Sequence, residues 1–238
     1  MNKFDSFSQR IFAKIVRFPI KARHTELSVL SSADDELSKP NDFLISLSIK
    51  AIKNAQKINL KNITIKNPYT DVWPGEHYKL LAGLVLALKP KVVVELGTGE
   101  GLSALSMKKH LPKGSKLVTF DIIPYNKLPN NYLKHSDFDD SFIQSTDDLT
   151  SYSTMLKHKN LLQSADFIFI DAAKDGEMEY KFLKNLARIG LKPNTIIAFD
   201  DIHVWNMLAF WRNIKHPKID VSSFGHWSGT GIIQWQNK

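Results

Sequence analysis

Short apolar runs alternate with amphipathic segments along residues 71–238. Runs of strand length are predicted at 91–95, 116–121, 142–146, 166–171, 194–200, 219–224 and 230–235. Between them, apolar residues recur at helical spacing near 101–110, 151–163, 177–188 and 203–213, and another helix is expected between Trp73-Pro-Gly75 and Leu88. This alternation predicts a parallel sheet with helices on both faces. The fold class is therefore α/β, a doubly wound, seven-stranded and mostly parallel sheet. The short segment 225–229 predicts a terminal hairpin that leaves one antiparallel strand at the sheet edge.

Residues 1–70 have a different pattern and are predicted to form a basic, mainly helical extension of a domain at 71–238. Phenylalanine and isoleucine recur at helical spacing over residues 4–19, with basic residues between them. This amphipathic helix is expected to pack on the main domain or on a second subunit, as in a homodimer. The alternative is peripheral contact of residues 1–24 with an anionic membrane. A helix over 43–55, capped by Asn41 or Asp42, and a short strand over 60–65 are also expected.

Composition and charge exclude several classes of function. A hydrophobic content of 43% is ample for a buried core, and the absence of cysteine rules out disulfides and thiolate metal sites. The longest apolar run, Leu80 to Leu88, is too short to span a bilayer, and no signal peptide is evident, so a cytoplasmic protein is expected. Residues 71–238 hold 20 Lys or Arg and 18 Asp or Glu. That near balance predicts no nucleic-acid partner.

The stretch from Val92 to Leu105 has the pattern of a cofactor-binding turn. Three consecutive valines predict a buried strand that ends at Glu95, and Leu102-Ser-Ala-Leu begins a helix. Between them lie glycines at 97, 99 and 101, which permit positive φ angles and the close approach of a ligand. The spacing is not that of the dinucleotide fingerprint, because the last position of G-x-G-x-x-G falls on Leu102.

Acidic residues end several of the predicted strands. Asp121 ends the second strand, twenty residues after Gly101, where such folds place a carboxylate on ribose hydroxyls. Asp171 ends the strand at 166–171, and Asp200-Asp201 end the strand at 194–200. Carboxyl ends of parallel strands meet at one edge of a sheet. Asp171, Asp200 and Asp201 are therefore expected to converge beside the glycine turn. Their repulsion predicts a bound divalent cation with oxygen ligands, most simply Mg²⁺.

These motifs resemble those of a known family. Glu95-x-Gly97-x-Gly99-x-Gly101 resembles motif I of the class I S-adenosylmethionine-dependent methyltransferases. Over residues 73–238 the chain resembles their cation-dependent O-methyltransferases, the catechol and caffeoyl-coenzyme A type. Three segments carry this likeness: Glu95-Leu-Gly97 to Gly101-Leu-Ser103-Ala, Asp171-x-x-Lys174, and Asp200-Asp201 at the place of the D-N or D-D metal pair.

The resemblance implies a role for each matching residue. S-adenosylmethionine would bind the turn that includes Glu95 and Thr98, with its carboxylate on Ser103 and its adenine amine near Asp148. Asp171 would serve both the cofactor and the metal, and Lys174 would be the general base. The implied reaction transfers a methyl group to a hydroxyl of a small molecule. A metal-using sugar O-methyltransferase is also compatible with the Asp-Asp pair.

Some alternatives stay open at this point. The alternative for Lys174 is a surface salt bridge with Asp171 or Glu177, and the alternative for Asp148 is an N-cap of the next helix. His203 and His226 are further candidates for a catalytic base or a substrate contact. A metal-independent methyltransferase acting on another nucleophile, or a non-catalytic protein with the same cofactor fold, would share many of these motifs.

Overall fold

The computed structural model describes residues 39–237, except for 62, 64–67, 129 and 205. Residues Ser38–Lys238 form one compact unit. The amphipathic helix predicted over 4–19, and any contact made by residues 1–24, lie outside the described residues. Helix α2 (Asp42–Ala55) belongs to the same compact unit as the sheet, although the predicted domain boundary lies at residue 70.

A sheet of seven strands forms the centre of this unit, as the sequence predicted. The strand order is β3-β2-β1-β4-β5-β7-β6, and β7 alone runs antiparallel to its neighbours. The antiparallel strand was expected at the edge, but it lies between β5 and β6. The strands are β1 (Val92–Leu96), β2 (Lys116–Phe120), β3 (Phe142–Ser145), β4 (Phe167–Ile170), β5 (Ile196–Asp200), β6 (Lys218–Asp220) and β7 (Thr230–Gln234).

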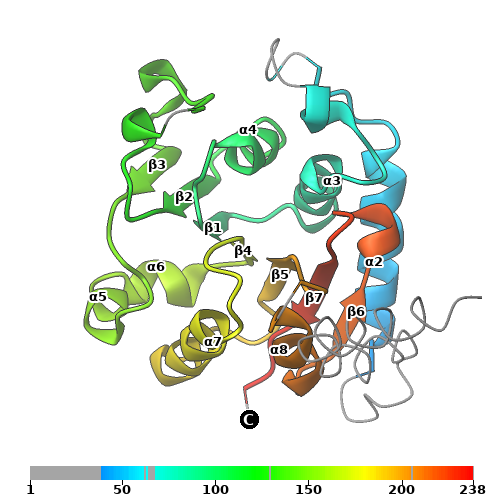
Figure 1. The fold of residues 1–238 in the computed structure, drawn as a ribbon, viewed down its shortest axis with the longest axis vertical. Helices are drawn as coiled ribbons and strands as arrows, with labels where there is room; N and C mark the ends of the chain where they lie inside the picture. The colour runs from blue at the N-terminus through cyan, green and yellow to red at the C-terminus, as the bar shows by residue number, and fades with distance from the viewer. Residues whose placement is uncertain (1–38, 62, 64–67, 129, 205, 238) are drawn as a thin grey trace, which may run out of the picture. The chain divides into compact units, whose positions relative to one another are not determined.

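Helices cover both faces of the sheet (Figure 1). One layer holds α2, α3 (Tyr78–Leu88) and α4 (Leu102–Lys108). The other holds α5 (Tyr152–Lys157), α6 (Lys159–Ser164), α7 (Glu177–Ile189) and α8 (Met207–Asn213). Successive residues of a strand pack against opposite helix layers. Val93 and Phe169 pack with α2–α4, whereas Val94 and Ile168 pack with α5–α8. This explains why the strands read as continuous apolar runs.

The start of α2 follows the predicted capping chemistry. Asn41 is the N-cap residue, and its side-chain oxygen accepts a hydrogen bond of 2.9 Å from the Leu44 backbone N–H. Its side-chain amide also donates to Gln234 on β7, which ties the helix to the sheet. Loss of such a cap typically costs about 1 kcal/mol of stability.

Several predicted boundaries were wrong for local reasons. The sixth strand, predicted over 219–224, ends at Asp220. The Asp220 carboxylate accepts a hydrogen bond from the Ser222 backbone N–H, and a 3-10 helix follows over Ser222–Phe224. Helix α8 begins four residues later than predicted, because the backbone N–H groups of Ile202 and His203 donate to the loop before β7. The helix predicted over 151–163 divides into α5 and α6 at His158.

Three other short helices lie in the connections of the described chain. The 3-10 helices are Pro68–Asp71, Tyr125–Lys127 and His135–Asp137. The strand predicted over 60–65 is not formed in its described part, where Ile63 N–H donates to the Leu60 carbonyl in a turn. Within the described residues, no helix combines the length and the apolar character that crossing a bilayer requires.

Candidate functional site

The glycine turn after β1 is closely packed on one side and open on the other. A Cβ at Gly97 would lie 1.8 Å from the Asp171 carbonyl oxygen, and one at Gly101 would lie 2.3 Å from the Leu133 side chain. Gly99 has nothing within 4 Å of that position, although its φ is also positive. The turn is therefore wedged against the end of β4 while its tip at Gly99 faces open space, as a ligand-binding turn requires.

A pocket of about 310 Å³ lies over this turn. Its lining contains six of the predicted cofactor residues together with the predicted base. The lining residues are Tyr78, Gly97, Thr98, Gly99, Glu100, Gly101, Leu102, Ser103, Asp171 and Lys174. The motif that suggests a cofactor and the D-x-x-K motif that suggests chemistry therefore meet in one cavity.

Glu95 lies beneath this pocket as a fully buried carboxyl group. Ser103 Oγ donates a hydrogen bond of 2.5 Å to one of its oxygens, and the other oxygen has no hydrogen-bond partner. Burial raises the pKa of Glu95 to about 7, although Ser103 opposes this shift. The structure therefore joins two of the predicted cofactor residues directly and leaves one buried oxygen unsatisfied.

Two of the other predicted cofactor carboxylates, Asp121 and Asp148, are engaged in turns. Asp121 accepts hydrogen bonds from the backbone N–H groups of Gly99 (3.1 Å) and Ile123 (3.0 Å), so it contacts the tip of the glycine turn. Asp148 accepts from the backbone and hydroxyl of Thr150. Contact with ribose or adenine stays a prediction for both residues.

Three carboxylates converge at the ends of β4 and β5, as predicted. Oxygen atoms of Asp171, Asp200 and Asp201 all lie within 4.8 Å of one another. The Lys174 ammonium lies among them, in contact with Asp201 and at 3.1 Å from Asp171 and 3.8 Å from Asp200. Burial alone would lower the pKa of Lys174, but the three carboxylates raise it well above its ordinary value. In this arrangement Lys174 is a counterion rather than a free base.

Backbone strain is concentrated at the same place. Lys174 and Asp201 both have left-handed φ angles, 61° and 57°, which non-glycine residues rarely adopt. Buried Glu179 stabilises the left-handed backbone at Lys174, because it accepts hydrogen bonds of 2.9 Å from the backbone N–H groups of Lys174 and Gly176. Strain of this kind costs of order 1–3 kcal/mol per residue and persists where the surroundings enforce it.

Two histidines that the sequence did not single out as a pair contact Asp200. His77, which precedes α3, places Nδ1 at 3.3 Å from Asp200 Oδ1, and His226 places Nδ1 at 3.1 Å from both Asp200 oxygens. Burial on its own would raise the pKa of Asp200, but these imidazoles lower it below its ordinary value. Burial would lower the pKa of His226, but the carboxylates raise it to about 10.

His203 occupies a different position from the one its sequence spacing suggested. Its Nε2 pairs with Asp220 at 2.7 Å, beside the hairpin loop. The histidine in contact with Asp200 and Asp201 is His226, which the sequence offered as a second candidate. A catalytic role for His203 stays a prediction, and its pairing with Asp220 favours His226 as the histidine of this site.

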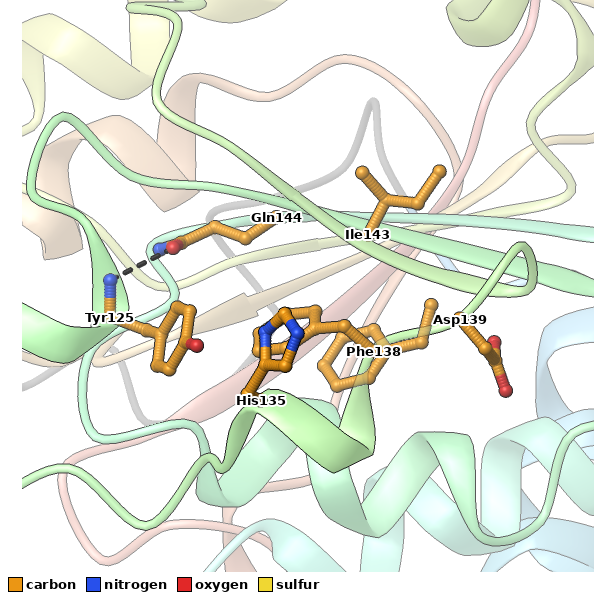
Figure 2. Close-up of a pocket in the computed structure, with 7 residues that line it drawn as sticks. Tyr125, His135, Phe138, Asp139, Ile143 and Gln144 are labelled. Carbon is orange, nitrogen blue, oxygen red and sulfur yellow. Dashed lines mark hydrogen bonds between the residues drawn. The ribbon is translucent and has the colours of Figure 1, made fainter.

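A second pocket, of about 340 Å³, lies beside β3 and the loop that follows Asp121. The rings of Tyr125 and Phe138 pack with their centroids 4.7 Å apart, and the Tyr125 backbone N–H donates to the Gln144 side chain at 2.8 Å (Figure 2). Gln144 also donates to Thr98 at 3.2 Å. This pocket shares no lining residue with the pocket over the glycine turn, so it is not part of the candidate site.

The model of an O-methyltransferase family matches residues 48–216. A probable caffeoyl-CoA O-methyltransferase from Dictyostelium discoideum is 27% identical over 69% of this chain, and the match spans 64% of that protein. A catechol O-methyltransferase from Mus musculus is 28% identical over 53% of this chain and 48% of its own length.

Solved structures show the same fold at low sequence identity. An SAH-bound methyltransferase from Podospora anserina aligns with a TM-score of 0.53 at 17% identity, covering 88% of this chain and 95% of its own. An O-methyltransferase from Bacillus cereus in complex with SAH aligns with a TM-score of 0.50 at 18% identity, covering 82% and 92%.

Proposed function

Because the chain belongs to the O-methyltransferase family, we propose that it transfers a methyl group from S-adenosylmethionine to a hydroxyl group of a small molecule, with help from a divalent cation. One observation carries this proposal: Asp171 and Lys174 belong both to the pocket over the glycine turn and to the carboxylate cluster. A cofactor in that pocket and an acceptor hydroxyl at the cluster would therefore be neighbours, which a direct transfer requires.

The relatives support the choice of cofactor and of acceptor class. Catechol and caffeoyl-CoA O-methyltransferases act, by their names, on hydroxyl groups, and two structures of the same fold hold SAH. Two features of the pocket support such a cofactor: its lining includes a glycine turn whose tip at Gly99 faces open space, and Asp121 contacts that tip. S-adenosylmethionine supplies a methyl group on a sulfonium centre that is already electrophilic.

The donor set at the carboxylate cluster fits a hard divalent cation. Asp171, Asp200 and Asp201 offer oxygen atoms alone, which is the chemistry that Mg²⁺ prefers. A bound cation would lower the pKa of a coordinated hydroxyl and orient it. The chain's own contribution is to hold the three carboxylates at the ends of two adjacent strands and to keep Lys174 beside them.

Lys174 is the proposed base, and its charge state depends on what else occupies the cluster. When no added cation binds the carboxylates, they raise the pKa of Lys174, and its ammonium cannot accept a proton. A divalent cation would neutralise the same carboxylates and repel the ammonium, so both effects favour the neutral amine. Cation binding and base activation are thus expected to be coupled at this site.

A second candidate, a metal-independent methyltransferase, is favoured by one specific observation. Three side chains that can carry a positive charge already face the three carboxylates: Lys174, His77 and His226. The cluster can therefore be electrically balanced by the chain itself, without an added ion. In that case His226, whose pKa is raised to about 10, would be held as a positive group rather than act as a base at neutral pH.

A panel of hydroxyl compounds tests the proposal directly. The full chain is incubated with S-adenosylmethionine carrying a labelled methyl group and with catechols, caffeoyl-type phenols or sugars, with and without Mg²⁺. Mass spectrometry of the product should locate the label on oxygen. Binding of NAD in preference to S-adenosylmethionine in calorimetry, or label found only on nitrogen or carbon, would overturn the assignment.

A further inference from the structure

A mixed nitrogen and oxygen cluster adjoins the three carboxylates. His77, Asp200 and His226 each offer one ligand atom, and these atoms lie within 4.8 Å of one another. They come from three separate places: the segment before α3, the end of β5 and the loop before β7. That loop is held to the first segment by backbone hydrogen bonds between Gly75 and residues 225 and 227.

The buried imidazole of His77 has no hydrogen-bond partner. Both of its ring nitrogens are unsatisfied, and the contact of 3.3 Å to Asp200 is not aligned for a hydrogen bond. The ring is fixed by packing against Tyr78 and Phe169, at centroid distances of 4.5 and 5.4 Å. A buried polar group without a partner lowers stability, so a ligand bound to one of these nitrogens would remove that penalty.

His226 is oriented in the way that metal-bound histidines are. Its Nδ1 faces Asp200, while its Nε2 lies 3.7 Å from the Glu76 carboxylate on the other side of the ring. Histidines that bind metals through one nitrogen commonly direct the other toward a carboxylate, which fixes the ring and strengthens the ligand. Glu76 precedes His77 in the chain, so one short segment contributes both a ligand and this support.

We propose that His77, Asp200 and His226 form a binding site for a borderline transition-metal cation such as Zn²⁺. Two imidazole nitrogens and one carboxylate suit zinc and its first-row neighbours, whereas Mg²⁺ prefers oxygen ligands alone. Asp200 belongs both to the three-carboxylate cluster and to this histidine cluster. The histidines would therefore let this end of the sheet bind a transition metal, whereas the three carboxylates alone favour Mg²⁺. The inference stands apart from the proposed methyl transfer, because cation binding is measured without any substrate.

Calorimetry on the metal-free full chain tests the site, with Zn²⁺ and Mg²⁺ as separate probes. We expect Zn²⁺ to bind more tightly than Mg²⁺, and His77→Gln or His226→Gln each to weaken Zn²⁺ binding by about tenfold or more while Mg²⁺ affinity changes little. His110→Gln is the matched control, because its ring bonds only the Ser106 carbonyl on α4. Equal Zn²⁺ affinity in both cluster variants and the control would overturn the proposal.

A spectroscopic measurement on the unaltered chain guards against misfolding of the buried His77 variant. Cu²⁺ is added at one equivalent, and its electron paramagnetic resonance spectrum is recorded. The proposal predicts hyperfine coupling to two nitrogens, reduced to one in His226→Gln, whose ring is less buried. A spectrum that shows oxygen ligands alone, or one that His226→Gln leaves unchanged, would show that the histidines are only counterions of Asp200.

Discussion

Lys174 Nζ lies 3.1 Å from Asp171 Oδ1, and the same ammonium reaches Asp201 at the end of the neighbouring strand. One lysine therefore joins the carboxyl ends of β4 and β5 beside the glycine turn. Lys174 makes these contacts from a backbone in the left-handed region, with a φ of 61°. This contact makes Lys174 the counterion of the site and, once another cation takes the carboxylates, the nearest amine to an acceptor hydroxyl.

Replacement of Lys174 by methionine should separate these two roles. Without the ammonium the carboxylates lose a competitor for cations, so Mg²⁺ affinity in calorimetry should stay the same or increase. Turnover should nevertheless fall by roughly 100-fold or more, because general bases typically contribute 10² to 10⁴ in rate. Unchanged turnover in Lys174→Met would remove the base role.

Lys192 provides the matched control for this substitution. It pairs with Asp166 near the opposite end of β4 and is similarly exposed. Lys192→Met deletes an ion pair of the same kind at a distance from the pocket. We expect its turnover and Mg²⁺ affinity to match those of the wild type, so an equal loss in both variants would indicate a general effect of charge or stability.

Gly97→Ala should weaken S-adenosylmethionine binding, because the new Cβ would collide with the Asp171 carbonyl and separate the turn from β4. Gly114→Ala is the control for the cost of a side chain at positive φ without a collision, since Gly114 also has a positive φ of 81° but open space around it. The control should lose about 1–2 kcal/mol of stability with no change in cofactor affinity. Calorimetry and urea unfolding of both variants check this, and equal cofactor affinity in the two would contradict the proposed role of the turn.

The buried carboxyl of Glu95 should make stability depend on pH. The folded chain keeps this proton up to about pH 7, whereas the unfolded chain releases it near the ordinary value of 4.5. Stability is therefore lost as pH rises between these values, by about 3 kcal/mol in total. Glu95→Gln cannot lose a proton, so its advantage over the wild type in urea unfolding should grow from pH 4.5 to 7. Parallel stability curves would show that the carboxyl is not perturbed.

The sheet and the convergence of Asp171 with Asp200 were predictable from sequence, because both follow from rules that act over short distances. Buried parallel strands appear as apolar runs, and their carboxyl ends meet at one edge whatever the loops do. Gly97 was predictable for a similar reason, since the strand-glycine-helix order is local. These features needed no knowledge of how distant segments pack.

The histidines of the site were not predictable in the same way. His77 reaches Asp200 only because the segment before α3 pairs with the loop before β7, through Gly75 and His226. No periodicity or motif marks that contact in a single sequence. His203 was a candidate because it lies close to Asp201 in the chain, but its backbone N–H donates to Ser228 in the hairpin loop and its side chain pairs with Asp220.

The turnover of metal-stripped enzyme is the most direct test of the central claim, that Asp171, Asp200 and Asp201 hold the cation that activates the acceptor hydroxyl. With an acceptor from the hydroxyl panel, a chelator should lower turnover by roughly 100-fold or more, and added Mg²⁺ should restore it. Affinity for S-adenosylmethionine should change little, because the glycine turn and Asp121 remain intact. Asp200→Asn should behave like the chelated enzyme. Full turnover in chelator, together with an Asp200→Asn variant as active as the wild type, would contradict the account and favour a metal-independent methyltransferase.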